Sequence, residues 1–293
     1  METKQISVWG RIGYFLLAIL PPIAFLGIQV VAGVIVVFFA MFLEFQNLGS
    51  AVLNGNVTEV TAMLLEKYAA ITVFASHLTT IPIMAVWYKF SFKKPRPKLF
   101  CSFKKVGLIS CLAGLVLGVV TCFIANGIEI LEYFFLPTTV LESFERLAET
   151  AGLGTNIVTI LSAVFLAPIS EELVCRGLVL NFSRKAFGKF WIANIIQALT
   201  FGLLHANWVQ GIYAFVIGLV FGYLVKVTGS VIPSIFAHFA VNGSSSTWIG
   251  LVFKDVPSTL PLGIMLAVIP WAVVIVLFVW LKKRNVEGNG VTE

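Results

Sequence analysis

The stretch Pro168-Ile-Ser-Glu-Glu-Leu-Val-Cys-Arg176 decides how this chain folds, because it places three ionisable side chains inside an apolar run that begins near Ile157. They are Glu171, Glu172 and Arg176. A charged side chain at the centre of a bilayer costs about 2.5–3.5 kcal/mol on insertion scales, so helices that face lipid rarely carry one. The stretch therefore indicates a membrane helix that faces a protein-lined, partly hydrated interior.

The composition of the whole chain indicates an all-α polytopic membrane protein. Of its 293 residues, 59% are hydrophobic and 12% are charged, whereas soluble domains carry about 25% charged residues. The basic residues behind the net charge of +6 fall in short loops, which is not the pattern of a nucleic-acid-binding protein. The four cysteines form no C-x-x-C pair and are expected to be reduced packing residues.

Eight apolar segments are predicted to cross the membrane. The Lys89–Lys105 loop carries seven basic residues and no acid, so the positive-inside rule places it in the cytoplasm, together with both termini. We expect N-terminal membrane helices and loops over residues 1–155, a core over 156–281 and a cytoplasmic tail over 282–293. Pro21 and Pro22 are expected to kink or divide the first span. The spans cover about 11–43, 68–88, 106–128, 156–189, 190–206, 210–227, 231–249 and 260–281.

Glu172 and Arg176 are four residues apart, so they share a helix face and are predicted to pair. Glu171 points about 100° away and has no local partner. If the fourth helix continues past Arg176 to near Lys189, Glu171 lies ~28 Å and His205 ~22 Å along the helix axes from one inner turn. The sequence thus predicts a long, tilted or broken fourth helix with a buried Arg176 and a free Glu171 carboxylate.

Two further places break the apolar pattern, Phe201-Gly-Leu-Leu-His205 and His238-Phe-Ala-Val-Asn242. Counting residues along the predicted helices brings both to a depth near that of Glu171. One free carboxylate, two histidines and an amide at one depth can activate a water molecule. The third histidine, His77, has no motif around it and is expected to pack.

These three motifs resemble those of the CAAX protease and bacteriocin-processing (CPBP) family, also called the Abi family, of intramembrane glutamate endopeptidases. The family motifs E-E-x-x-x-R, F-x-x-x-H and H-x-x-x-N are Glu171-Glu172-Leu-Val-Cys-Arg176, Phe201-Gly-Leu-Leu-His205 and His238-Phe-Ala-Val-Asn242. The resemblance covers about residues 168–246, and the first half of the chain carries no matching motif. It implies an intramembrane active-site cavity among about eight helices.

The resemblance also implies a role for each residue. Glu171 is expected to activate the water, with His205 holding or deprotonating it, and His238 and Asn242 to form the oxyanion hole. The supporting residues are Glu172, Arg176 and Phe201. No cofactor is implied. The residues alone leave a zinc site open, made by Glu171, His205 and His238, although the chain has no H-E-x-x-H motif.

The expected function is hydrolysis of a peptide bond in a membrane-associated peptide or protein tail. Peptide processing, bacteriocin self-immunity or regulation in a bacterial plasma membrane is favoured, and CAAX prenyl endopeptidase activity is the alternative. Two other classes stay open, a proton-coupled transporter and a non-catalytic membrane scaffold or sensor. The expected partners are the bilayer and a peptide substrate, and not nucleic acid.

Overall fold

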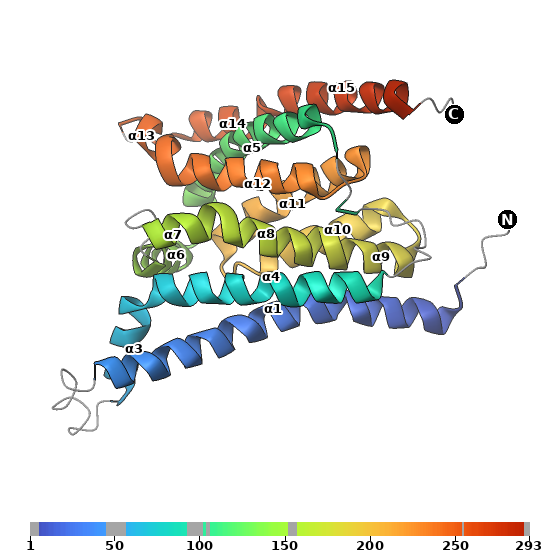
Figure 1. Ribbon diagram of the computed structural model, residues 1–293. Helices are drawn as coiled ribbons and strands as arrows, with labels where there is room; N and C mark the ends of the chain where they lie inside the picture. Colours follow the sequence, from blue (N-terminus) through green and yellow to red (C-terminus); the bar gives the residue numbers. More distant parts are fainter. Residues whose placement is uncertain are drawn as a thin grey trace.

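The structure is a computed structural model that describes residues 6–44, 57–92, 102–103, 106–151, 157–253 and 255–289. Over these ranges the chain is helical apart from short connections and one bridge between Ser102 and Ser230. The helices lie side by side in layers, with α1 and α4 at one side and α5, α14 and α15 at the other (Figure 1). The first half comprises α1 (Val8–Leu43), α3 (Val57–Lys67), α4 (Ala69–Ser91), α5 (Leu108–Phe135) and α6 (Thr138–Ala151).

The second half begins with the fourth helix, which runs from Ile157 to Phe187 and is interrupted by two π-helical segments. It comprises α7 (Ile157–Leu161), a π-helical segment (Ser162–Leu166), α8 (Ala167–Glu172), a second π-helical segment (Leu173–Val179) and α9 (Leu180–Phe187). The rest comprises α10 (Phe190–Leu203), α11 (Trp208–Thr228), α12 (Ile232–Ser244), a π-helical segment (Ser245–Ile249), α13 (Gly250–Phe253), α14 (Leu260–Val268) and α15 (Trp271–Asn289).

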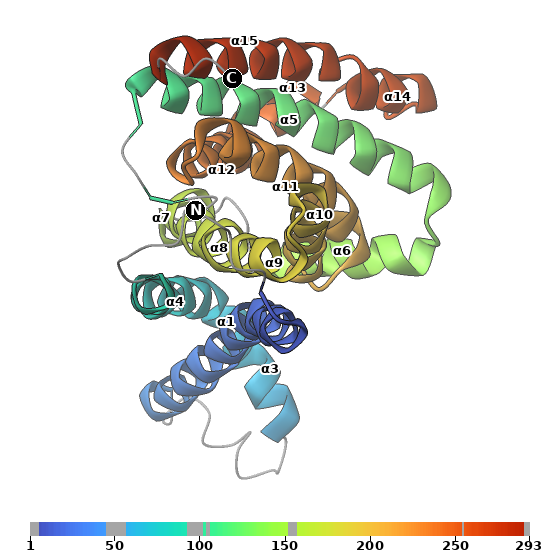
Figure 2. The ribbon, with the colours of Figure 1, turned by 90° about the vertical axis from the view of Figure 1, so that its right-hand side faces the viewer.

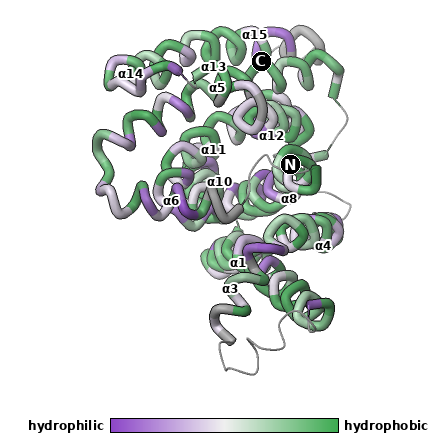
Figure 3. The backbone as a smooth tube through the Cα atoms, turned by 90° about the vertical axis from the view of Figure 1, so that its left-hand side faces the viewer, coloured by the Kyte–Doolittle hydropathy of each residue, from purple (hydrophilic) through white to green (hydrophobic). Residues whose placement is uncertain are grey.

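Six helices within the described residues are long and apolar enough to cross a membrane. The predicted helical polytopic membrane protein is therefore confirmed, whereas the count of eight crossings stays a prediction. Much of the backbone at the outside of the bundle belongs to hydrophobic residues (Figure 3). The six spans are Val8–Leu43, Ala69–Ser91, Leu108–Phe135, Ile157–Phe187, Trp208–Thr228 and Leu260–Arg284, and the shorter apolar helix is Phe190–Leu203.

The fourth helix confirms the prediction on which the site depends. It continues for eleven residues beyond Arg176 and ends at Gly188, whose φ of 70° is left-handed and stops the helix. Lys189 is extended, and α10 then starts at Phe190 and runs back beside α9. Glu171 and the end of α10 are thereby brought to neighbouring depths.

The helix bounds differ from the expectations at two places, and for the first span only a division at the prolines is excluded. α1 passes through Pro21 and Pro22 as one helix and does not divide there. α5 extends beyond residue 128 to Phe135, so Glu129 and Glu132 lie within the helix and not in an outer loop. The loop that follows contains the amphipathic helix α6, which the sequence analysis did not predict. Most of the predicted basic loop and residues 290–293 lie outside the described residues.

A close helix contact holds α12 in place. A Cβ atom at Gly114 or Gly118 of α5 would collide with the backbone carbonyl oxygens of Pro233 and Ala237 on α12. Only glycine allows two helices to approach so closely. In the end-on view α12 lies between α5 and the fourth helix (Figure 2). Since His238 directly follows Ala237, this contact fixes its depth against the fourth helix.

Candidate active site

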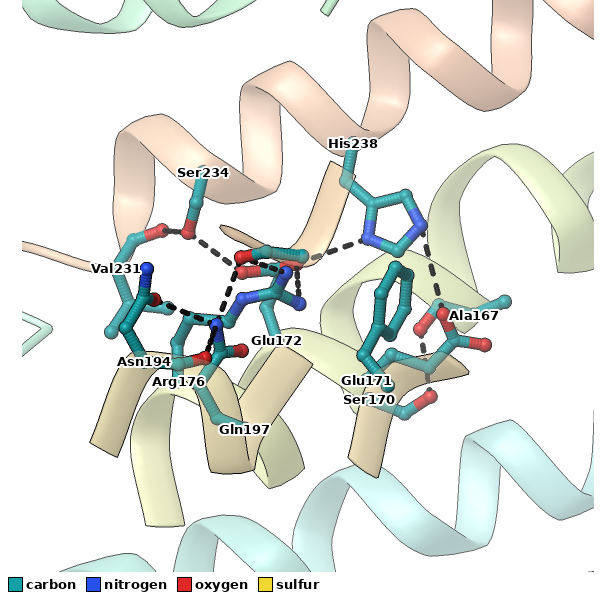
Figure 4. Close-up of polar contacts among 12 residues, drawn as sticks. Ala167, Ser170, Glu171, Glu172, Arg176, Asn194, Gln197, Val231, Ser234 and His238 are labelled. Carbon is teal, nitrogen blue, oxygen red and sulfur yellow. Dashed lines mark hydrogen bonds and ion pairs between the residues drawn. The ribbon is translucent and has the colours of Figure 1, made fainter. Parts of the chain in front are cut away.

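Glu172 and Arg176 form the predicted pair in the interior of the bundle. Arg176 Nη1 donates to Glu172 Oε1 at 2.7 Å, and both side chains are fully buried. The Ser234 hydroxyl donates to Glu172 Oε2 at 2.7 Å from α12 (Figure 4). A buried carboxylate is stable only when its charge is compensated and its oxygens are hydrogen-bonded. Both conditions are met, because Arg176 compensates the charge of Glu172 and each of its oxygens accepts a hydrogen bond.

The Arg176 guanidinium is enclosed by groups that suit a cation. Its Cζ lies 4.6 Å from the ring centroid of Phe201 and 5.5 Å from that of Phe221. Its Nη2 donates to the carbonyl of Gly218 at 3.4 Å, an oxygen that also accepts from the Gln197 amide at 2.8 Å. Cation–π contacts are strongest where water is excluded. Phe201 therefore supports Arg176 through its ring face.

His238 lies between the two glutamates. Its Nδ1 is 3.1 Å from Glu172 Oε1, and its Nε2 is 3.6 Å from Glu171 Oε2 (Figure 4). Because the paired Glu172 carboxylate can only accept, His238 Nδ1 carries a hydrogen. Glu171 retains 14% of its side-chain exposure, whereas Glu172 has none. Glu171 is thus the carboxylate without a guanidinium partner, and α12 supplies the neighbour that its own helix lacks.

His205 lies in the turn that follows α10, because the helix ends at Leu203, three residues before the predicted bound. Its Nδ1 donates to the carbonyl of Phe201 at 2.9 Å. A carbonyl has no hydrogen to give, so in the neutral ring the lone pair is on Nε2. The Phe201 ring meets both His205 and His238 edge-on, at centroid distances of 5.1 and 5.4 Å. Phe201 is therefore the residue through which the second and third motifs touch.

Asn242, one turn beyond His238, is half-buried. Its Nδ2 donates to the carbonyl of Ala163 at 2.8 Å, in the first π-helical segment of the fourth helix. One amide hydrogen and the amide oxygen remain for another partner. The structure thus places Asn242 on the same side of α12 as His238, tied to the helix that carries Glu171.

The sequence analysis did not predict the polar contact that His77 makes. Expected to pack, it is 4% exposed on α4, and its Nδ1 is 2.7 Å from the hydroxyl of Ser170, the residue before Glu171. It also interacts electrostatically with Glu171 and His238. In the sequence it was marked only as a histidine within a largely apolar span, and that signal does not name its partner.

A metal site receives no support from the described residues. No three His, Cys, Asp or Glu side chains among them are grouped so that they could hold a metal ion. The open alternative of Glu171, His205 and His238 as zinc ligands is therefore not assembled in this arrangement. Cys111, Cys122 and Cys175 are free and buried, in keeping with the expected packing role.

Two apolar cavities flank the end of α10. One of about 310 Å³ lies between α1 and α10 and is lined in part by Pro22, Leu26, Thr200 and Leu204. The other, of about 450 Å³, lies along α10 and α11 and is lined in part by Trp208. The lining of each cavity includes a direct sequence neighbour of His205, Leu204 in the first and Ala206 in the second.

The family comparison matches the part of the chain that carries these residues. The model described as type II CAAX prenyl endopeptidase Rce1-like matches residues 153–244. This region is Rce1-like. The resemblance inferred from the three motifs is thereby confirmed for the region, which contains every predicted site residue and excludes His77. No match to a curated protein or to a solved structure was found.

The Rce1-like match supports an intramembrane protease of the CAAX type in general. Together with the apolar helices, it also supports an integral membrane protein whose substrate is a peptide in the bilayer.

Proposed function

We propose that this protein is an intramembrane glutamate endopeptidase that hydrolyses a peptide bond at the end of a membrane-associated peptide or protein. The observation that carries the proposal is His238, whose two ring nitrogens face two glutamates of unequal burial. The fully buried Glu172 is neutralised by Arg176, and the partly exposed Glu171 is left for chemistry. The Rce1-like match over the same residues supports a CAAX-type protease in general.

In the proposed reaction Glu171 takes a proton from a water molecule, and the hydroxide attacks the peptide carbonyl carbon. His205 Nε2, whose lone pair faces away from Phe201, accepts a hydrogen bond from that water. The carbonyl oxygen becomes an oxyanion, which His238 Nε2–H and Asn242 Nδ2–H stabilise. Loss of one such donor typically costs about 2.7–4 kcal/mol. The Glu171 proton then passes to the leaving amine as the C–N bond breaks.

His238 can act as a donor because of its two carboxylate neighbours. Because the hydrogen of a neutral His238 ring is on Nδ1 and is directed to Glu172, the ring must gain a second hydrogen, on Nε2, before Nε2 can donate. The carboxylates on either side of the ring, Glu172 at 3.1 Å from Nδ1 and Glu171 at 3.6 Å from Nε2, lie where they offset the charge of a ring that donates from both nitrogens. Glu172 therefore has a second proposed role, in which it holds the His238 ring ready to carry charge during the reaction.

The substrate class follows from the membrane setting and from the family match. The apolar cavities beside α10 suit a hydrophobic segment or a lipidated tail. The CAAX-type description makes a prenylated C-terminal peptide the first substrate to test. Peptide processing or bacteriocin self-immunity in a bacterial plasma membrane is also proposed, with comparative membrane proteomics as its test.

The decisive experiment compares wild type with Glu171→Gln in lipid nanodiscs. An internally quenched, farnesylated CAAX peptide reports cleavage, and membrane proteomics of producing cells searches for other lost products. Replacing the base should reduce the rate by about 10²–10⁴-fold. Glu142→Gln, at an exposed position of α6, is the matched control. Equal cleavage by Glu171→Gln and wild type would refute the role of Glu171, and the absence of any cleavage product of the wild type in either assay would favour a non-catalytic scaffold.

A further inference from the structure

His77 belongs to α4, in the part of the chain that the Rce1-like match does not cover. α4 packs against α8 and against both π-helical segments of the fourth helix. The His77 ring is buried, with Phe25 of α1 on one side at a centroid distance of 5.8 Å and Ser170 of α8 on another. The first half of the chain thus places one polar side chain directly beside the Glu171 helix.

The Ser170 hydroxyl contacts two groups, the carbonyl of Ala167 at 2.9 Å and His77 Nδ1 at 2.7 Å. When its one hydrogen is donated to the carbonyl, which can only accept, its oxygen accepts from His77 Nδ1–H. The remaining nitrogen of a neutral His77 ring is then an acceptor. Both side chains are buried, at 4% and 0% exposure. These hydrogen bonds connect His77 to Ser170, the residue that directly precedes Glu171.

Packing alone does not account for a histidine at this position. A leucine or phenylalanine would fill the same space between Phe25 and α8 without the cost of burying an imidazole. An imidazole that hydrogen-bonds to Ser170 ties the α8 turn that carries Glu171 to α4, and so restricts the position of that carboxylate.

We propose that His77 is a positioning residue for Glu171, which acts through its hydrogen bond to Ser170. This rests on the proposed function, in which Glu171 is the base. The N-terminal half of the chain would then contribute to the active site. Its α4 would add His77 to the polar residues that lie in the Rce1-like region.

The test compares His77→Asn with His77→Phe. Asparagine can place an amide N–H where Nδ1 lies and keeps the bond to Ser170, whereas phenylalanine keeps only the volume. We expect His77→Phe to reduce kcat on the farnesylated peptide about fivefold, the factor for ~1 kcal/mol of one hydrogen bond, with KM unchanged. His77→Asn should retain wild-type kcat. Thr80→Val, which removes a buried hydroxyl from the same helix, is the control.

A second measurement does not depend on any substrate. Dicyclohexylcarbodiimide modifies protonated carboxyl groups in membranes, and mass spectrometry gives the modification rate at Glu171. Because loss of the hydrogen bond to Ser170 frees the α8 turn and makes the Glu171 carboxyl group easier for the reagent to reach, His77→Phe should increase this rate about fivefold. His77→Asn and Thr80→Val should not. Ser170→Ala, which removes the acceptor with little change in volume, should resemble His77→Phe.

The two measurements separate the two proposals. If no protein cleaves the peptide but the Glu171 modification rate follows the expected order, His77 positions the carboxylate and the proposed function fails for this substrate. If His77→Phe, His77→Asn and wild type are modified equally fast, the inference is overturned even where the peptide is cleaved. Size-exclusion profiles establish whether each variant is folded. If His77→Phe is not folded, the modification rate of Ser170→Ala tests the positioning role in its place.

Discussion

Replacing Arg176 by leucine is expected to destabilise the folded protein by about 3–5 kcal/mol, because it leaves a buried carboxylate without its cation. Glu172 would keep two partners, the Ser234 hydroxyl at 2.7 Å and His238 Nδ1 at 3.1 Å. It would lose the bond from Arg176 at 2.7 Å. Both side chains of this pair are fully buried, so water cannot replace the lost partner. The contact between the guanidinium and Phe201, at 4.6 Å, is lost as well and is worth up to about 2 kcal/mol where water is excluded.

The chain contains a matched control for this experiment. Glu142 and Arg146 of α6 have the same spacing of four residues, but they are 60% and 79% exposed and their charged atoms are 3.7 Å apart. Such a pair contributes about 0.3–0.5 kcal/mol. The stabilities of Arg176→Leu and of the control Arg146→Leu are measured by unfolding in a titration with sodium dodecyl sulfate, followed by tryptophan fluorescence.

The double variant Glu172→Gln with Arg176→Leu separates loss of a contact from creation of an unpaired charge. Glutamine can still accept from Ser234 and His238 and carries no charge, so the double variant should be less destabilised than Arg176→Leu alone. If Arg176→Leu costs no more than Arg146→Leu, or if the double variant is no better than the single one, the reasoning about a buried ion pair is refuted.

Three further predictions concern packing, burial and metal. Gly118→Val should separate α12 from α5, cost about 1–3 kcal/mol and lower kcat, since its side chain would meet the Ala237 carbonyl. Gly13→Val, where a Cβ has free space, is the control in the same titration. Glu132→Leu should raise stability by about 1–3 kcal/mol, because Glu132 is 5% exposed and neither carboxyl oxygen has a partner among the described residues; an unchanged or lowered midpoint contradicts this. Treatment with 1,10-phenanthroline should leave peptide hydrolysis unchanged, and a loss that zinc restores would overturn the metal-free mechanism.

The depths of the site residues could be predicted from the sequence, because counting residues along a helix needs no knowledge of its neighbours. The continuation of the fourth helix past Arg176 and the burial of that side chain were both obtained in this way, and the structure confirms them. The Glu172–Arg176 pair is likewise a property of one helix. Each of these predictions uses contacts within a single segment.

Contacts between helices far apart in the sequence could not be predicted in the same way. His77 and Ser170 are 93 residues apart, and no period in either segment indicates that they meet. The end of α10 was missed for a related reason. Residues 204–206 are apolar or carry the motif histidine, but the Asn207 side chain caps α11, and the turn that joins the two helices takes these residues out of α10.

The faces of the fourth helix were harder to predict than its depth, and its two π-helical segments are the physical reason. A π-helical turn holds an extra residue, so the side chains that follow are rotated by about 100° from the positions on a regular α-helix. The angle predicted between Glu171 and Glu172 applies because both lie within α8, between the two segments. The first π segment also contains the Ala163 carbonyl that accepts from Asn242, a contact that a regular helical wheel does not suggest. Two glutamates on different faces are then joined by one imidazole from α12, which reaches each with a different nitrogen. The regular helix therefore places Glu171 and Glu172 on different faces, whereas the contact of Asn242 with Ala163 involves the π-helical segment.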